Sequence, residues 1–353
     1  MTEFCRAAVF VAAGSPLELR TLPLPKLLPH QVLVQVTCCT ICGSDLHSFT
    51  GARSSPTPGV LGHEIIGRIE RLPAGGISDV CGQSLRAGDR VTWSVAASCG
   101  QCDRCERRMP QKCDSLFKYG HERFANGTEL SGGLADYCVL HSGTAIMKLP
   151  DDLPDRIACP ASCATATVAA AVRNAGALAG RRVLVMGAGM LGLTACAFAR
   201  AADAASVCLC DPVEARRVLG LKFGATEAVA AIDSEDFDCV FEMSGNAFAV
   251  EAAIRAATVG GRIVLVGSVS PSQPVAVDPE RVVRRLLTIC GVHNYLPEDL
   301  VTAVKFLQAT HASCPFEELV EKSWPLSDVN AAFEYAVQER PIRVAVLPDS
   351  TAR

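Results

Sequence analysis

The sequence lacks the features that mark an exported or membrane-embedded chain. Its start, MTEFCRAAVF, has no basic leader and no apolar run ending at a small-residue cleavage site, so no signal peptide is predicted. The one long uncharged stretch, residues 183–199, is interrupted by Gly187, Gly189 and Gly192. It favours a buried strand followed by a buried helix over a membrane span. We therefore expect a cytoplasmic protein with no membrane partner.

An excess of charge of one sign is also absent. The formal net charge is −4 over 353 residues, which gives no reason to expect nucleic acid or an anionic membrane as the main partner. The chain is 49% hydrophobic and 20% charged, so we expect a packed core and no extensive disorder. Its length allows two domains of ordinary size.

Cysteine, in contrast, is abundant, with 18 residues. Because no export signal is predicted, the thiols are expected to stay reduced, which argues against a disulfide scaffold. Most cysteines in apolar runs are expected to be small buried side chains. Four others, Cys99, Cys102, Cys105 and Cys113, lie close together in the chain. A redox pair, a nucleic-acid-binding ribbon and a metal site are the alternatives for this loop.

The pattern of apolar residues changes along the chain. Residues from about 7 to 150 form short β-rich runs, such as VLVQVTC and EIIGRIE, broken by glycine and proline. From about residue 163 to 292, strands alternate with helices, which implies βαβ units on a parallel sheet. The tail returns to two helices and a last strand, RVAVL. We expect an α/β protein with a β-barrel domain at 1–163, a doubly wound parallel sheet at 164–294, and a C-terminal return at 295–353.

A glycine-rich turn lies at the start of the alternating block. Gly187-Ala-Gly-Met-Leu-Gly192 fits G-x-G-x-x-G, follows the strand-like RRVLVM and opens an apolar helix. The helix N-terminus would face the phosphates of a dinucleotide. Asp211, 19 residues beyond Gly192, could accept the ribose hydroxyls and would repel a 2′-phosphate, which favours NAD over NADP, although Arg216 and Arg217 follow closely.

A second group of chemically suited residues lies in the first domain. CCTICGSDLHSF supplies Cys42, and LGHE supplies His63 and Glu64. Thiolate, imidazole and carboxylate together form a ligand set that suits zinc.

Together these residues resemble the zinc-containing medium-chain alcohol dehydrogenases over nearly the whole chain. The resemblance is carried by Cys42-Gly-Ser-Asp-Leu-His47, Gly62-His-Glu64, the loop Cys99–Cys113, Cys163 and the turn Gly187–Gly192. It implies a GroES-like catalytic domain and a Rossmann domain, with the active site in the cleft between them.

The resemblance also implies two zinc ions per chain. Cys42, His63 and Cys163 would hold a catalytic zinc, with Cys163 matching the yeast-type enzymes where the polyol branch has glutamate. Glu64 would lie next to this metal and join it transiently, and Asp45 would orient His63. The lobe at about 96–116 would hold a structural zinc through Cys99, Cys102, Cys105 and Cys113, closing the coordination sphere.

The remaining roles follow from the same resemblance. Ser44 and His47 match a relay that carries the proton of the alcohol to solvent, and Arg343 aligns with an arginine that reaches the cofactor pyrophosphate. The expected cofactor-binding residues are Gly187, Gly189, Met190, Leu191, Gly192, Asp211, Arg216 and Arg343.

The expected function is the reversible oxidation of a primary or secondary alcohol by hydride transfer to NAD, with zinc acidifying the alcohol. The stretch 118–126 resembles a subgroup associated with phosphonate breakdown, and His121, Arg123 and Arg53 could receive an anionic substituent. A polyol dehydrogenase and a non-catalytic nucleotide-binding relative are the alternatives. The family also implies a homodimer or homotetramer joined through sheet edges, for which GRIVLVG, residues 261–267, is a plausible edge.

Overall fold

The computed structural model describes residues 4–125, 127–271 and 273–349, which form two compact units. Unit 1 comprises Met1–Cys163, Leu296–His311 and Phe316–Arg353. Unit 2 comprises Ala164–Tyr295 and Ala312–Pro315. The sequence of unit 2 is therefore inserted into that of unit 1, and the chain passes from the first unit to the second directly after Cys163.

Unit 1 is built mainly from β-strands. One sheet has the order β2-β1-β4, and a second has the order β16-β17-β3-β5-β6-β7, with β8 paired to β3 and β9 paired to β6. The strands are β1 (Phe4–Phe10), β2 (Glu18–Pro23), β3 (Val32–Thr40), β4 (Gly59–Val60), β5 (Glu64–Arg71), β6 (Arg90–Ala97), β7 (Phe117–Lys118), β8 (Tyr137–Leu140), β9 (Thr144–Lys148), β16 (Val320–Pro325) and β17 (Arg343–Leu347).

Strand β3 is the centre of this unit because it pairs with three others. It runs antiparallel to β5, β8 and β17, and its apolar side chains are buried on both faces. Thr40 lies opposite both Glu64 of β5 and Ala345 of β17. The register thus places the end of β3 next to the starts of β5 and β17, where polar residues of the candidate site lie.

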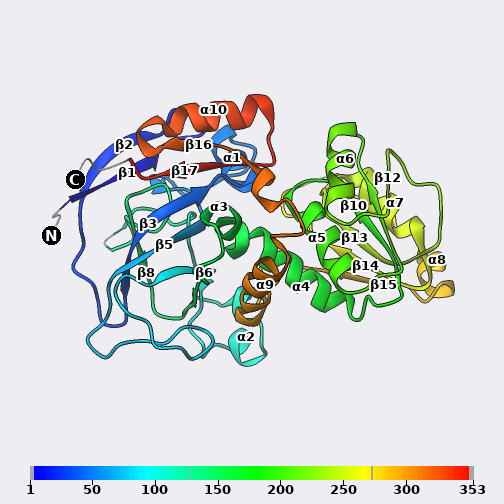
Figure 1. Ribbon diagram of the computed structural model, residues 1–353, viewed down its shortest axis with the longest axis horizontal. Helices are drawn as coiled ribbons and strands as arrows, with labels where there is room; N and C mark the ends of the chain where they lie inside the picture. Colours follow the sequence, from blue (N-terminus) through cyan, green and yellow to red (C-terminus); the bar gives the residue numbers. More distant parts are fainter. Residues whose placement is uncertain (1–3, 126, 272, 350–353) are drawn as a thin grey trace. The chain divides into compact units, whose positions relative to one another are not determined.

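Short helices connect these strands. They are α1 (Gly43–Thr50), α2 (Asp103–Glu106), α3 (Asp155–Ala158), α9 (Pro297–Thr310) and α10 (Val329–Glu339). Helix α10 lies over β16 and β17 (Figure 1), and its apolar face, which includes Phe333, is fully buried there. Helix α1 begins directly after Cys42 and ends at Gly51, which adopts a left-handed conformation.

Unit 2 is a six-stranded parallel sheet with the order β12-β11-β10-β13-β14-β15. This order is that of a doubly wound dinucleotide-binding sheet, with its crossover between β10 and β13. The elements are α4 (Ala164–Ala175), β10 (Arg182–Met186), α5 (Met190–Ala201), β11 (Ser206–Cys210), α6 (Glu214–Lys222), β12 (Glu227–Val229), β13 (Phe237–Glu242), α7 (Ala247–Ala256), β14 (Ala257–Leu265), α8 (Pro279–Arg284) and β15 (Thr288–Gly291).

Two expectations about this unit have different outcomes. The stretch 183–199 is a buried strand, β10, followed by a buried helix, α5, as expected. The expectation that GRIVLVG forms a sheet edge is wrong, because most of this segment belongs to β14, which has β13 on one side and β15 on the other. The edge strand on this side is β15. It is short and less apolar than β14, so the sequence pattern does not identify it as the edge.

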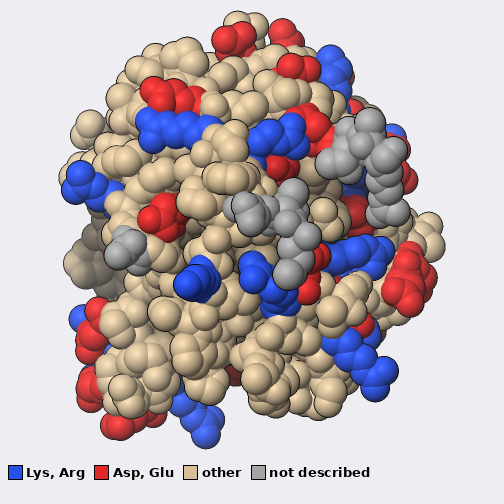
Figure 2. Space-filling model, turned by 90° about the vertical axis from the view of Figure 1, so that its left-hand side faces the viewer, with Lys and Arg blue, Asp and Glu red and all other residues tan. Residues whose placement is uncertain are grey.

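The distribution of surface charge and the character of the helices agree with what the sequence composition predicts. On the face shown in Figure 2, Lys and Arg lie among Asp and Glu, and no broad area carries one sign of charge. Within residues 4–125, 127–271 and 273–349, no helix has both the length and the apolar character needed to cross a bilayer.

The central position of β3 predicts a large effect of a truncation there. Leu33 of β3 is 0% exposed, so Leu33→Ala should destabilise unit 1 by about 2–5 kcal/mol through lost contacts and a residual cavity. Both tryptophans of the chain, Trp93 and Trp324, lie in unit 1, so their fluorescence during denaturant unfolding reports this unit. The control Leu28→Ala, at a side chain that is 65% exposed, should leave the midpoint nearly unchanged. Equal midpoints for the two variants would contradict the prediction.

Candidate metal and nucleotide sites

Three side chains from separate segments of unit 1 meet at one point. Cys42 precedes helix α1, His63 precedes strand β5, and Cys163 follows a short 3₁₀ helix formed by Cys159–Ser162. One ligand atom from each residue lies within 4.8 Å of the others. The 3₁₀ helix is tied to β5 because Ser162 Oγ donates a hydrogen bond of 3.3 Å to the carbonyl of His63. The structure thus brings the three predicted zinc ligands together.

Asp45 holds this arrangement in place. Its carboxylate accepts hydrogen bonds from the backbone amides of Cys42, at 2.9 Å, and Gly62, at 3.1 Å, and lies 3.3 Å from His63 Nδ1. Asp45 and His63 are 1% and 4% exposed. With Nδ1 facing a carboxylate, Nε2 is left to serve as a metal ligand, which is the usual support for a zinc-bound histidine.

Gly62 is required at its position for two reasons. Its φ of +90° belongs to the left-handed region, which side chains rarely adopt. A Cβ atom there would also lie 2.6 Å from the sulfur of Cys39. Glycine therefore allows the chain to turn sharply and present His63 beside Cys42.

The electrostatics of this cluster fit a divalent cation. The Cys163 thiol, as a hydrogen-bond donor, lowers the pKa of Cys42 well below its usual value, and Arg343 contributes, while burial opposes the shift. Burial also opposes the charged form of His63, but Asp45 and Cys42 outweigh it and raise the pKa of His63 to about 10. His63 and Cys163 thus hold their protons more tightly than usual while Cys42 loses its proton more readily, and a metal ion binding there would release the bound protons. Two thiolates and an imidazole are the donor set that suits zinc.

Glu64 and Arg343 form a buried ion pair beside the cluster. Arg343 Nε and Nη2 donate to the two carboxylate oxygens of Glu64 at 2.9 and 3.1 Å, and Thr40 Oγ1 donates to Oε2 at 2.6 Å. Arg343 Nη2 also lies 3.5 Å from Cys42 Sγ. Burial raises the pKa of Glu64, and Arg343 offsets part of this effect.

This pairing bears on two expected roles. Among the described residues, the group that could hold a metal ion here consists of Cys42, His63 and Cys163 and does not include Glu64. The carboxylate of Glu64 accepts hydrogen bonds from Arg343 and Thr40 instead. Its transient metal ligation therefore stays a prediction. Arg343 faces Glu64 and Cys42 here, so its contact with a cofactor pyrophosphate also stays a prediction.

The two residues of the expected proton relay lie on helix α1. Ser44 Oγ is 3.3 Å from His63 Nε2, so the hydroxyl is next to the ligand position. His47 is three residues further along the same helix, on the same face as Ser44, and is exposed. The structure therefore spaces a hydroxyl and an imidazole between the cluster and the surface of unit 1.

Two side chains of the segment 118–121 interact with the cluster: the sequence suggested His121 for an anionic substituent and did not assign Lys118. The ring of His121 lies 5.1 Å from that of His63, and its Nδ1 is 2.8 Å from the carbonyl oxygen of Tyr119. Burial, and then the charges of His63 and Lys118, lower the pKa of His121 to about 3, so this imidazole is neutral at pH 7. Burial lowers the pKa of Lys118, whose ammonium also interacts electrostatically with Cys163, Arg53 and Cys42. Sequence reasoning missed Lys118 because only the pairing of β7 with β6 brings it here.

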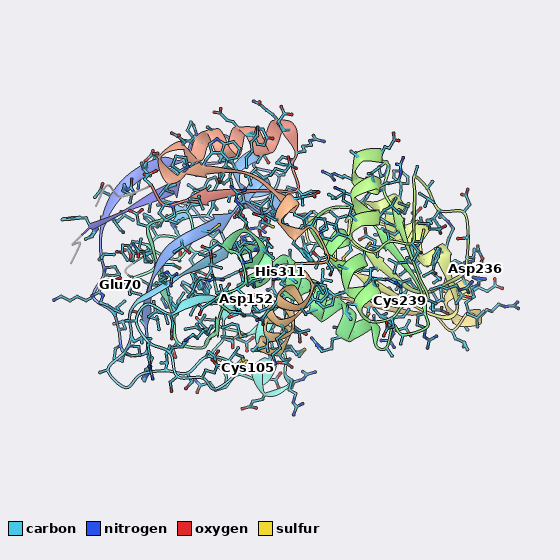
Figure 3. The ribbon with its side chains drawn as sticks, viewed as in Figure 1. Glu70, Cys105, Asp152, Asp236, Cys239 and His311 are labelled. Atoms are coloured by element: carbon cyan, nitrogen blue, oxygen red, sulfur yellow. The ribbon has the colours of Figure 1, made fainter. Side chains whose placement is uncertain are left out.

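The four remaining clustered cysteines form a second group in unit 1. Ligand atoms of Cys99, Cys102, Cys105 and Cys113 all lie within 4.8 Å of one another, and Cys113 Sγ is 3.4 Å from Cys99 Sγ and 3.9 Å from Cys102 Sγ. Cys105 is labelled on the loop that carries α2 (Figure 3). The backbone amides of Gln101 and Asp114 lower the pKa values of Cys99 and Cys102. Burial instead raises the pKa of Cys105 to about 12. Four clustered thiols fit a tetrahedral metal that has no open position.

The glycine-rich turn of unit 2 has the geometry of a nucleotide-binding loop. It connects β10 to α5, and Gly189 precedes the helix, so that Met190 and Leu191 occupy its first turn. A Cβ atom on Gly192 would lie 1.7 Å from the carbonyl oxygen of Gly187, so the tight turn requires glycine there. The free amides at the start of α5 form a site suited to phosphate.

Asp211 lies directly after β11, at the same end of the parallel sheet as the glycine-rich turn that follows β10. Its carboxylate accepts hydrogen bonds from the amides of Ala188, at 2.7 Å, and Val213, at 2.8 Å. The first of these bonds links Asp211 to the glycine-rich turn. Arg216 lies in α6, the next helix, and Arg217 Nη1 donates to the carbonyl oxygen of Asp211 at 2.8 Å. The structure therefore places a carboxylate beside the candidate nucleotide loop.

Comparisons with known proteins agree with this arrangement. Residues 28–151 match the family described as Alcohol dehydrogenase GroES-like domain, and residues 191–309 match the family described as Zinc-binding dehydrogenase. An L-threonine 3-dehydrogenase from Anaeromyxobacter dehalogenans is 31% identical over 331 residues, which cover 88% of this chain and 89% of that protein.

Two solved structures share the fold. An alcohol dehydrogenase from Thermotoga maritima superimposes with a TM-score of 0.92 at 24% identity, covering 98% of this chain and 100% of that chain. A zinc-binding dehydrogenase from Sinorhizobium meliloti, solved with NADP bound, has a TM-score of 0.86 at 24% identity, with the same coverage.

The four-cysteine lobe predicts a structural effect of losing one ligand. Cys105→Ser should remove about one zinc ion per chain and lower the melting temperature by roughly 5 °C or more, because the closed site loses a thiolate. Metal analysis and thermal unfolding measure the two effects. Cys81→Ser, at an exposed cysteine outside both clusters, is the control. Unchanged zinc content in Cys105→Ser would show that the lobe does not hold a metal.

Proposed function

The chain belongs to the zinc-containing medium-chain alcohol dehydrogenases, and we propose that it catalyses the reversible oxidation of a primary or secondary alcohol with NAD as hydride acceptor. The observation that carries this proposal is the convergence of Cys42, His63 and Cys163 on one point. Three ligands leave a fourth position for a substrate, whereas the Cys99–Cys113 lobe leaves none. We propose two zinc ions per chain on this basis.

The bound groups and the protein contribute different parts of the chemistry. Zinc, when bound, lowers the pKa of an alcohol and polarises a carbonyl, and the nicotinamide accepts or returns hydride. The protein supplies the orientation of the ligands: Asp45 fixes His63, and the Glu64–Arg343 pair borders Cys42 on its other side. Both carboxylates are buried and hold their partners in one position.

The proton of the alcohol leaves through the protein in this proposal. Ser44 Oγ lies 3.3 Å from His63 Nε2 and can accept that proton while it passes its own onward. His47, an exposed imidazole three residues further along α1, is the last carrier in this proposal.

The preference for NAD is proposed from Asp211. A carboxylate next to the glycine-rich turn can accept hydrogen bonds from ribose hydroxyls and repels a 2′-phosphate. The NADP in the Sinorhizobium meliloti structure does not decide the matter, because at 24% identity that likeness concerns the fold alone.

The substrate is proposed as a small alcohol that carries an anionic substituent, such as a carboxylate or phosphonate. The Anaeromyxobacter relative is named for L-threonine, a secondary alcohol with a carboxylate, which supports this class. A polyol dehydrogenase is the second candidate. A non-catalytic nucleotide-binding relative is disfavoured because it would have no use for a three-ligand metal site.

We also propose that the chain acts in the cytoplasm as a homodimer or homotetramer, with a small molecule and neither nucleic acid nor membrane as its partner. Eighteen free cysteines suit a reducing compartment. The edge strand β15 and the exposed side chains of Val283 and Leu286 near it suit self-association.

Removal of one catalytic ligand tests the proposed function. Cys42→Ser should lower kcat/KM for alcohol oxidation by roughly a thousandfold or more, because several kcal/mol of charge stabilisation are lost. The reduction of NAD is followed by absorbance with a panel of alcohols, and zinc content should fall by about one ion per chain. Cys81→Ser should behave like the wild type. An active Cys42→Ser variant, or a zinc-loaded wild type that oxidises no alcohol, would contradict the proposal.

Replacement of Asp211 tests the cofactor preference. Asp211→Asn removes the negative charge and keeps an oxygen acceptor for one of the two amides, those of Ala188 and Val213, that bind the two carboxylate oxygens. The ratio of kcat/KM for NAD to that for NADP should fall roughly tenfold or more, which corresponds to about 1.4 kcal/mol. Asp233→Asn, an exposed residue of the same unit, should leave the ratio unchanged. A ratio that favours NADP in the wild type would reverse the assignment.

A further inference from the structure

A buried carboxylate in unit 2 belongs to neither metal site and lies outside the glycine-rich turn. Glu242 is the last residue of β13, which pairs with β10 on the side away from β11. Its side chain is 0% exposed. Oε1 accepts three hydrogen bonds, from Ser244 Oγ at 2.5 Å, Ser244 N at 2.8 Å and Gly245 N at 2.9 Å. Oε2 has no hydrogen-bond partner among the described residues.

All hydrogen bonds of this carboxylate go to one loop, which comprises residues 243–246. A buried carboxylate oxygen without a donor is unfavourable, so an apolar side chain would serve the packing of the sheet better. The contacts of Oε1 continue along the loop, because Ser244 Oγ also accepts a hydrogen bond of 3.1 Å from the amide of Asn246. Asn246 in turn caps helix α7 through its side chain. Glu242 therefore fixes the loop 243–246 from its buried side.

The glycine-rich turn borders this loop on one side. The amide of Met243 donates to the carbonyl of Met186, the last residue of β10, at 2.9 Å. A Cβ atom on Gly187 would lie 2.9 Å from the Cβ atom of Ser244, so the first glycine of the turn packs directly on Ser244. The position of Ser244, which the Glu242 carboxylate sets, is therefore also the position of one wall of the candidate nucleotide loop.

The end of β14 borders the loop on its other side. The amides of Val266 and Gly267 donate to the carbonyl of Glu242 at 2.9 and 3.0 Å. Gly245 has a φ of +71°, and a Cβ atom there would lie 2.5 Å from the carbonyl oxygen of Gly267. The carboxyl ends of β10, β13 and β14 thus meet at this loop. In a doubly wound sheet the ligand binds outside the carboxyl ends of the strands, at the point where the strand order reverses.

We propose that Glu242 is a positioning residue for nucleotide binding: it holds the loop 243–246 against Gly187, and the position of this loop sets the affinity of unit 2 for a dinucleotide. This inference rests on the proposed function, which requires a nicotinamide nucleotide at the turn Gly187–Gly192. Glu242 acts through the loop, because its own side chain is fully buried. A loop that is fixed before binding loses less conformational freedom when the ligand binds, so the affinity is higher.

Nucleotide binding by three variants tests this role. Calorimetry with the zinc-loaded protein gives Kd for NADH, or for NADPH if the wild type binds NADPH more tightly. Glu242→Ala should raise Kd about tenfold or more, because the loop loses three hydrogen bonds. Glu242→Gln keeps an oxygen for these donors and should stay within about twofold of the wild type. Ser244→Ala, at an exposed position, removes one donor and should raise Kd about threefold.

A core variant separates positioning of the loop from loss of stability. Ile263→Ala truncates a fully buried side chain of β14, between β13 and β15, and should lower the melting temperature but leave Kd unchanged. Each titration is made well below the melting temperature of the variant. Hydrogen exchange of a peptide that contains residues 243–249 should be faster in Glu242→Ala than in Ile263→Ala.

Two results would overturn the positioning role. One is a wild-type Kd in Glu242→Ala, and the other is an equal rise of Kd in Glu242→Ala and Ile263→Ala. If Glu242→Ala does not fold, an unchanged Kd in Ser244→Ala overturns the proposal in its place.

Steady-state kinetics distinguish this inference from the proposed function. In Glu242→Ala the KM for the nucleotide should rise about tenfold, whereas kcat at saturating nucleotide should not fall, because the three candidate zinc ligands lie in unit 1. If Glu242→Ala weakens nucleotide binding but the wild type oxidises no alcohol, the positioning role stands and the proposed oxidation fails. If the wild type oxidises an alcohol and Glu242→Ala has the same KM for the nucleotide, only the positioning role fails. A wild type that binds neither NADH nor NADPH would overturn both.

Discussion

The contacts of one buried carboxylate determine the candidate catalytic site. Asp45 binds the amide that starts helix α1, the amide of Gly62 and the imidazole of His63, so it joins two segments of unit 1 and sets the orientation of a third group. A buried carboxylate without such partners would be strongly unfavourable. The hydrogen bonds that stabilise the buried Asp45 carboxylate therefore also hold Cys42 and His63 at a fixed separation. Cys163, the last residue of the first segment of unit 1, supplies the third candidate ligand atom.

Charges around this site are arranged in a definite order. Asp45 lies next to His63, and Glu64 and Arg343 lie beside Cys42. Asp45 supports a candidate metal ligand, and Glu64 and Arg343 balance each other's charge. The lobe of Cys99–Cys113 has a different character, because backbone amides lower the pKa values of Cys99 and Cys102 and four clustered thiols would fill a tetrahedral metal site.

Local patterns in the sequence predicted much of the fold and the site. The strand, glycine-rich turn and helix at 182–201 follow from apolar runs and glycine spacing, whereas the ligand sets of the two cysteine groups, Cys163 included, follow from the family resemblance. Contacts that depend on strand register could not be found in this way. Arg343 meets Glu64 only because β17 and β5 flank β3 near Thr40, and Lys118 reaches the site through β7 and β6. The same limitation led to the wrong sheet edge, since a buried apolar run does not distinguish β14 from its neighbour β15.

The pairing of β17 with β3 has a consequence for synthesis on the ribosome. Strand β3 is made before unit 2, but its partner Arg343–Leu347 is made only after all of unit 2. Unit 2 has its complete sheet and can fold while translation continues, because domains generally fold as units. The thiols of Cys42 and Cys163 remain without Arg343 until β17 has been made. Unit 1 therefore closes around the Cys42–His63–Cys163 cluster only after unit 2 has been synthesised.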